Sequence, residues 1–148
     1  MKSLLLNLPY NLDKRNDFEE LIQPYGLACI SSALKERGYD VTLFDAWAHR
    51  MTRKEVVEYV RKLAPDVIGI TTYTYNLSSV ISILPEFCRI LPGTKIVLGG
   101  PHPTTEPLST LENHTDVDIC VIGEGEYTFA GILDCLKEGN SLSSVPGI

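Results

Sequence analysis

Five short apolar runs alternate with longer stretches that carry helix signals, and this alternation constrains the fold more than any other feature of the sequence. The runs cover residues 3–8, 41–45, 67–72, 95–98 and 119–122. Strands without polar alternation are typical of parallel sheets, because helices cover both faces of such sheets. The stretches between them are therefore expected to form the covering helices.

Residues at the ends of these stretches predict where the helices begin and end. Pro24 opens a helix over 24–37, and Gly38 follows its end. Thr52 with Glu55 forms a capping box that starts a helix over 52–63. By the same signals, further helices are predicted over 78–91, 107–113 and 126–137.

The expected fold class is α/β, a flavodoxin-like or Rossmann-like three-layer sandwich built on a five-stranded parallel sheet. Right-handed crossovers favour the strand order 2-1-3-4-5. With 148 residues and 44% hydrophobic residues, the chain is the size of one domain, 1–148. In such sheets a ligand binds at the carboxyl ends of the strands, so the loops at 9–23, 71–77, 99–106 and 123–127 are the expected site.

Charge and composition exclude several partners. A net charge of −6 argues against nucleic acid and against an anionic membrane surface. No apolar run is long enough to span a bilayer and none resembles a signal peptide, so a cytoplasmic location is expected. The four cysteines are not in C-x-x-C spacing, which favours buried thiols over a zinc site.

The loops at the expected site contain unusual residues. Hydroxyl and aromatic groups at Thr71, Thr72 and Tyr73 indicate either a polar wall or a continued strand. The pair Gly99-Gly100 indicates either close approach of a ligand to the backbone or a tight turn. His102 is the only histidine there, and it is a metal ligand, a supporting residue or a surface residue.

The last of these loops, Gly123-Glu124-Gly125-Glu126, opens a helix but does not complete a dinucleotide fingerprint, because Thr128 stands where the third glycine is needed. The two carboxylates would repel a pyrophosphate and instead complement the helix dipole. A ribose-binding role for Asp45 lacks the glycine fingerprint after the first strand. Receiver, flavodoxin and P-loop sites are excluded because their required residues are missing.

Taken together, four segments resemble one family. They are Pro24–Ala28 with the helix end Leu34–Gly38, then Gly69-Ile70-Thr71, then Gly99–Thr104, then Gly123–Glu126. The chain is similar over its whole length to the N-terminal cobalamin-binding domain of cobalamin-dependent radical SAM enzymes. This class includes the anaerobic magnesium-protoporphyrin IX monomethyl ester cyclase and many methyltransferases.

The resemblance implies a cobalamin site that differs from the usual pattern of such domains. The family's glycine pair matches Gly99-Gly100, and Thr71-Thr72-Tyr73 stands at the S-x-L position with both ends substituted. The D-x-H-x-x-G motif is missing, since residues 9–23 contain no histidine. The resemblance therefore implies base-off cobalamin without a histidine ligand from this first loop.

By the same resemblance, particular residues are expected around the cofactor. A slot for its nucleotide tail is expected from Thr71, Thr72, Ser78, Gly99 and Gly100. Tyr10 and Asn11 are expected to cover the lower corrin face, and Tyr73 and His102 to line the site. Gly123 and Glu124 are also expected to bind the cofactor, with Glu124 and Glu126 at the rim of the site or at the domain interface.

The chain lacks the C-x-x-x-C-x-x-C motif that holds an iron–sulfur cluster in the family's partner domain. The resemblance thus assigns the iron–sulfur cluster and S-adenosylmethionine to a radical SAM domain in cis, and this chain alone is not expected to be an enzyme. Residues 140–148 are expected to begin the linker to that domain. Two alternatives are an interaction domain that has lost the cofactor and a flavin or nucleotide binder.

Overall fold

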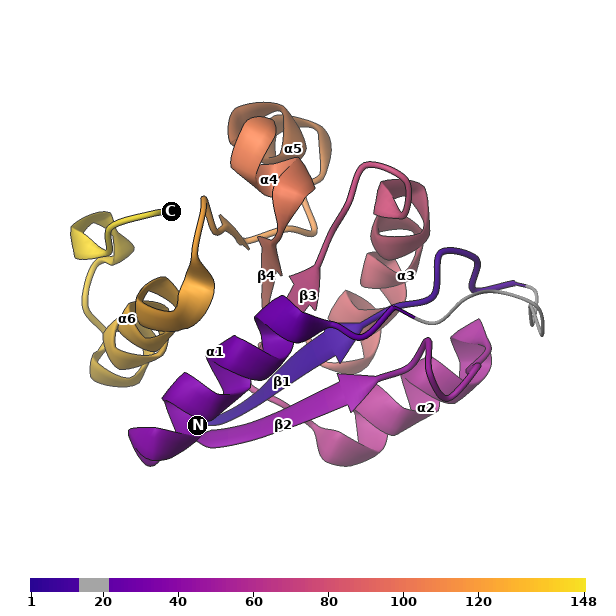
Figure 1. Cartoon of the computed structure of the whole chain (residues 1–148), viewed down its shortest axis with the longest axis horizontal. Helices are drawn as coiled ribbons and strands as arrows, with labels where there is room; N and C mark the ends of the chain where they lie inside the picture. Colours follow the sequence, from indigo (N-terminus) through magenta and orange to yellow (C-terminus); the bar gives the residue numbers. More distant parts are fainter. Residues whose placement is uncertain (14–21) are drawn as a thin grey trace.

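The computed structural model describes residues 1–13 and 22–148 and contains one sheet of five parallel strands. The strands are β1 Lys2–Asn7, β2 Asp40–Asp45, β3 Val67–Thr71, β4 Lys95–Gly99 and β5 Ile119–Cys120. Their order is β2-β1-β3-β4-β5, which confirms the expected α/β sandwich (Figure 1).

Helices cover both faces of this sheet. They are α1 Tyr25–Glu36, α2 Arg53–Leu63, α3 Leu77–Ile90, α4 Pro101–Thr105, α5 Pro107–Asn113 and α6 Gly125–Glu138, followed by the 3₁₀ turn η1 Leu142–Ser144. Figure 1 shows α1 and α6 on one side of the sheet, α2 and α3 on the other, and α4 and α5 above the strand ends. The carboxyl edge of the sheet is therefore bordered by α4, α5 and the starts of the long helices.

Alternation along the strands divides the interior into two cores. Leu4 and Leu6 of β1 point into the core under α2 and α3, whereas Leu5 points into the core under α1 and α6. All three leucines are fully buried. Apolar residues on both faces are the reason why β1 lies near the centre of the sheet.

The boundaries differ from the sequence prediction at the carboxyl edge. Residues 99–106 were expected to be a loop, but Pro101–Thr105 forms α4, with Gly100 turning at a φ of 102° before it. A proline at the first helical position is already set for helical geometry. β5 is also shorter than the expected 119–122, since the amide of Ile122 donates to the carbonyl of Gly147 at 2.8 Å.

The residues after η1 fold back onto the domain, where Val145 is 8% exposed. The expectation that 140–148 begins a linker stays a prediction. Within the described residues, no helix has the length and hydrophobicity needed to cross a membrane.

One prediction concerns the contact that joins the end of α1 to α6. Tyr39 donates its hydroxyl to Asp134 Oδ1 at 2.6 Å, and burial together with this carboxylate raises the pKa of Tyr39 to about 12 from 10.0. As the pH rises from 10 to 12, the folded state keeps a proton that the unfolded chain loses. The free energy of unfolding therefore falls over that range.

We expect Tyr39→Phe to make this alkaline fall shallower, measured as the urea midpoint at each pH. The control is Tyr127→Phe, because Tyr127 is 78% exposed. An unchanged slope in Tyr39→Phe would contradict the assignment.

Candidate functional site

A pocket of about 340 Å³ opens at the carboxyl edge, on the side of the sheet that α1 and α6 cover. β1, β3 and β4 form its floor, the two helices form its walls, and the turns after β3, β4 and β5 surround its mouth. This is the position at which doubly wound folds bind ligands. The volume lies near the low end of the range for small-molecule sites.

The floor is a trough because two strand residues lack side chains. Gly69 of β3 pairs with Leu5 of β1 on one side and Val97 of β4 on the other. One row nearer the carboxyl edge, Thr71 pairs with Gly99. Two glycines on adjacent strands thus remove the side chains that would otherwise fill the space beneath α1 and α6.

The two floor glycines have different neighbours. A Cβ at Gly69 would lie 2.6 Å from Cε2 of Phe129 and 3.0 Å from Cδ2 of Leu5, so the glycine is required for Phe129 to pack. A Cβ at Gly99 would meet only Val121, at 3.8 Å. Gly99 therefore borders open pocket space, whereas Gly69 accommodates an aromatic ring.

The walls are apolar and the mouth is polar. Leu27 and Ile30 of α1 face Phe129 of α6 across the pocket. Gly125 at the start of α6 allows Ile30 to approach, since a Cβ there would lie 2.6 Å from Cδ1 of Ile30. The polar side chains in the lining belong to Thr71, Tyr73, Thr104, Glu124 and Glu126.

A hydroxyl of α4 holds two of the turns at the mouth together. Thr104 Oγ1 donates to the carbonyl of Gly100 at 2.8 Å and accepts the amide of Gly123 at 3.1 Å. A Cβ at Gly100 would lie 2.9 Å from the carbonyl oxygen of Thr72, so this turn requires glycine. Thr104 was not among the predicted site residues, although its position at the end of the motif Gly99–Thr104 could have indicated a place at the site.

The pocket brings together part of the predicted set. Its lining includes Thr71, Tyr73, Gly99, Gly100, Gly123 and Glu124. Sequence reasoning did not propose the wall residues Leu27, Ile30 and Phe129, because nothing distinguishes them from ordinary core residues. The one available signal was Gly69, an unusual residue inside a buried strand.

Three predicted residues do not line the pocket. Thr72 is fully buried, and its amide donates to the carbonyl of Gly99 at 2.7 Å. His102 Nδ1 lies 3.2 Å from Thr74 Oγ1, in the turn after β3. Ser78 is exposed on α3, in the opposite layer.

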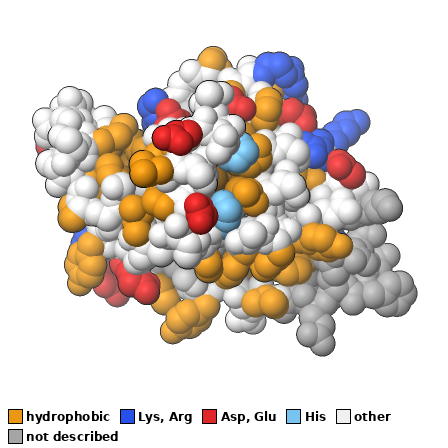
Figure 2. Space-filling view, turned by 90° about the horizontal axis from the view of Figure 1, so that it is seen from above, with side chains coloured by type: hydrophobic (Ala, Val, Ile, Leu, Met, Phe, Trp, Pro, Cys, Tyr) orange, Lys and Arg blue, Asp and Glu red, His pale blue; other side chains and the backbone are white. Residues whose placement is uncertain are grey.

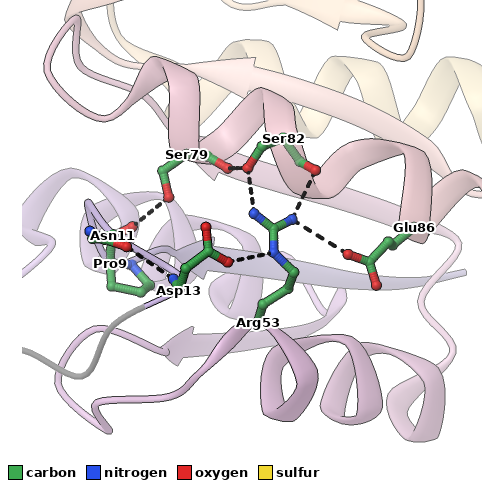
Figure 3. Close-up of polar contacts among 7 residues, drawn as sticks. All are labelled: Pro9, Asn11, Asp13, Arg53, Ser79, Ser82 and Glu86. Atoms are coloured by element: carbon green, nitrogen blue, oxygen red, sulfur yellow. Dashed lines mark hydrogen bonds and ion pairs between the residues drawn. The ribbon is translucent and has the colours of Figure 1, made fainter.

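Neither Tyr10 nor Asn11 lines the pocket, and Asn11 belongs to the part of the loop after β1 that Arg53 holds against the opposite layer (Figure 3). Arg53 pairs with Asp13 at 3.0 Å and reaches Ser82 Oγ of α3 at 2.8 Å. Ser79 Oγ donates to the carbonyl of Pro9 at 3.1 Å. The described part of this loop is thus tied to α2 and α3, and the rest of the predicted loop, 14–21, lies outside the described residues.

A pair of aromatic rings on the turn after β3 lies at the rim of the pocket. The rings of Tyr73 and Tyr75 stack with centroids 5.2 Å apart, and Asn76 Oδ1 accepts the amide of Tyr73 at 2.8 Å. Burial, followed by the nearby Tyr73, raises the pKa of Tyr75 above its usual value. The Tyr75 phenol therefore presents a neutral hydroxyl at physiological pH.

The carboxyl edge has few basic groups near its centre. In the view from above, hydrophobic, uncharged, acidic and histidine side chains fill the middle, and Lys and Arg lie toward the margin (Figure 2). Among the described residues that line the pocket there is no Lys or Arg, while Glu124 and Glu126 are present. This arrangement disfavours a free polyphosphate, which requires positive charge or a helix N-terminus without carboxylates.

Comparison with known proteins identifies the family. The model of the B12 binding domain matches residues 15–133. The chain belongs to this family. One curated relative is an uncharacterized methyltransferase of Pyrococcus horikoshii, which is 32% identical over 84% of this chain. Another is the anaerobic magnesium-protoporphyrin IX monomethyl ester cyclase of Synechocystis, which is 34% identical over the full length of this chain.

Solved structures share the fold of this B12 binding domain. The cobalamin-dependent S-adenosylmethionine radical enzyme OxsB with aqua-cobalamin bound matches with a TM-score of 0.83 over 99% of this chain, at 22% identity. The methyltransferase TsrM of Kitasatospora setae, with cobalamin and a [4Fe-4S] cluster bound, matches with a TM-score of 0.80 over 99% of the chain, at 23% identity.

This chain spans only part of each of these proteins. It covers 27% and 30% of the two curated relatives, and 20% and 28% of the OxsB and TsrM chains.

The different surroundings of the two floor glycines give a prediction about stability. Gly69→Ala places a methyl group against Phe129 and Leu5 and is expected to lower the free energy of unfolding by about 1–3 kcal/mol. Gly99→Ala, whose methyl has room, is expected to stay within about 1 kcal/mol of wild type.

Urea unfolding measures both variants. Phe129→Leu in the Gly69→Ala background is expected to recover part of the loss, because it removes the ring edge that the methyl meets. Equal losses in Gly69→Ala and Gly99→Ala would contradict this account of the floor.

Proposed function

We propose that the chain is the cobalamin-binding module of a radical SAM enzyme, and that the pocket receives the nucleotide tail of the cofactor. The observation that carries the proposal is the trough made by Gly69 and Gly99, in a chain of the B12 binding domain family. A pocket of about 340 Å³ is suited to a flat base with its sugar rather than to a whole corrin ring.

The residues present fit such a tail. Leu27, Ile30 and Phe129 offer apolar surfaces on both sides of a planar base. Thr71 offers a hydroxyl near the mouth, where a ribose and a phosphodiester need hydrogen bonds, whereas Thr104 already donates its hydroxyl to the carbonyl of Gly100. A single phosphodiester near Glu124 is more acceptable than a polyphosphate, since it carries one charge. Bound cobalamin would supply cobalt-centred methyl transfer or redox chemistry.

The protein's own contribution is to bind and orient the cofactor and to exclude water from its tail. We infer that cobalamin binds base-off, because a tail held in the pocket keeps its base away from the cobalt. We also infer that it binds without a histidine ligand from the first loop, because residues 9–23 contain no histidine. Of the predicted cofactor contacts, those of Tyr10, Asn11, Thr72, Ser78 and His102 are not supported by the tail pocket. Any contact of theirs would be with another part of the corrinoid.

We further propose that a radical SAM domain in cis packs on the carboxyl edge and holds the iron–sulfur cluster and S-adenosylmethionine. Two exposed aromatic side chains flank the pocket at the starts of α1 and α6, where Tyr25 is 79% and Tyr127 is 78% exposed. Exposed aromatic groups around a site are typical of interaction surfaces. Methyl transfer and oxidative cyclisation are the two reaction types to be tested in the whole enzyme, and a cytoplasmic location stays a prediction.

Retention of a corrinoid tests the proposed function. Wild-type protein mixed with hydroxocobalamin and then passed through a desalting column should keep the visible corrinoid absorbance. Gly99→Trp should abolish retention because the indole fills the tail pocket. Its matched control is Gly93→Trp, since Gly93 is exposed in the turn before β4, at the opposite edge, with nothing within 4 Å of its Cβ position.

Loss of retention in Gly93→Trp as well would indicate misfolding. Absence of retained absorbance in the wild-type protein would overturn the proposal in favour of an interaction domain without cofactor. A flavin absorbance on purification would instead support the flavin alternative.

The state of the bound cofactor gives a separate prediction. Electron paramagnetic resonance of the protein loaded with cob(II)alamin should show cobalt hyperfine lines without nitrogen superhyperfine splitting. The spectrum of His102→Ala should match that of wild type, because His102 Nδ1 faces Thr74 rather than the pocket. Nitrogen splitting that disappears in His102→Ala would show that His102 ligates the cobalt.

A further inference from the structure

The apolar segment Val145-Pro146-Gly147 folds back onto the domain, and each of its residues makes a specific contact there. Val145 is 8% exposed and packs on α6 at Gly131, where a Cβ would lie 3.3 Å from Val145 Cγ1. The missing side chain of Gly131 thus provides the space that Val145 occupies.

Backbone groups of the same segment bond to α6 and to the residue after β5. Thr128 Oγ1 donates to the carbonyl of Pro146 at 3.1 Å, and the amide of Ile122 donates to the carbonyl of Gly147 at 2.8 Å. Gly147 has a φ of +83°, and a Cβ there would lie 2.9 Å from Thr128 Oγ1. Both the conformation and the contact therefore require glycine at this position.

These contacts end directly beside the pocket. Ile122 immediately precedes Gly123, Glu124 and Gly125, which line the pocket. Thr104 holds this rim from the side of α4 by accepting the amide of Gly123 at 3.1 Å. The segment 145–147 holds it from the other side, through Ile122.

We infer that residues 145–147 act as a strap that positions the β5–α6 rim of the pocket, so that docking of the strap and binding of a corrinoid tail stabilise each other. The inference rests on the proposed function for the identity of the ligand. Because the coupling is thermodynamic, it works in both directions: undocking the strap weakens binding, and binding holds the strap in place. Thr128, Gly131 and Gly147 are then positioning residues, since none of them lines the pocket.

The test uses a matched pair of glycines. Gly147→Ala and Gly38→Ala both place a side chain at positive φ, at +83° and +80°, but a Cβ at Gly38 meets nothing within 4 Å. Gly38 lies just after α1, at the amino edge of the sheet. Both variants therefore carry the same backbone strain, and only Gly147→Ala disturbs the strap.

Amide hydrogen exchange without ligand reports on the strap alone. Exchange at Ile122 and Gly123 is expected to be about three- to tenfold faster in Gly147→Ala, which corresponds to the loss of one net hydrogen bond, and unchanged in Gly38→Ala. Thr128→Val, which removes the hydroxyl bond to Pro146 at 3.1 Å together with the longer one to the carbonyl of Glu124 at 3.4 Å and keeps the side-chain shape, is expected to act in the same direction. Unchanged exchange in Gly147→Ala and Thr128→Val would overturn the inference.

Titration with hydroxocobalamin tests the coupling. Dissociation constants are expected to rise about fivefold or more in Gly147→Ala and to stay near wild type in Gly38→Ala. Wild-type protein should also exchange more slowly at Ile122 and Val145 when loaded. Equal affinity in wild type and Gly147→Ala would overturn the inference. Failure of the wild-type protein to bind would overturn the proposed function, and the exchange experiment without ligand would still decide the role of the strap.

Discussion

The pairing of Gly69 with its neighbours Leu5 and Val97 is the constraint on which the site depends. A parallel sheet covered by helices is normally filled on both faces, since interiors pack as densely as crystals. Here one face lacks a side chain at one position on each of two adjacent strands, Gly69 of β3 and Gly99 of β4. Phe129 fills the first gap and the pocket lies over the second, so a single pattern of strand residues sets both the packing of α6 and the position of the pocket.

The fold was predictable because its signals are local and agree with one another. Apolar strands, the capping residues Thr52 and Glu55, and terminal glycines each mark an element, and right-handed crossovers leave few topologies. The amide of Thr52 does donate to Glu55 Oε2, at 2.8 Å. The sequence prediction was wrong at α4, where two prolines and a glycine pair are typical of a loop. It was also wrong at the end of β5, where the carbonyl of Gly147 accepts the amide of Ile122 in place of a neighbouring strand.

The candidate site was predictable only where backbone chemistry is unusual. Gly99, Gly100 and Gly123 stand out in the sequence, and all three line the pocket. Leu27, Ile30 and Phe129 do not, since an apolar residue on a helix has the same pattern whether it faces a core or a ligand. Tyr10 and Asn11 were placed beside the site by loop order, but Arg53 and Ser79 attach that loop to the other layer.

The division of the interior into two cores has a consequence for how such a domain can change over time. The core under α2 and α3 is filled by Leu4, Leu6 and Phe87, all fully buried, and none of these three lines the pocket, although Ile70 of the same core does. Substitutions in the wall under α1 and α6 can therefore alter which ligand fits while the other core keeps the chain folded. Because the face under α1 and α6 has a buried core of its own, a change in its wall alters both the ligand that fits and the stability, and the opposite core limits the loss.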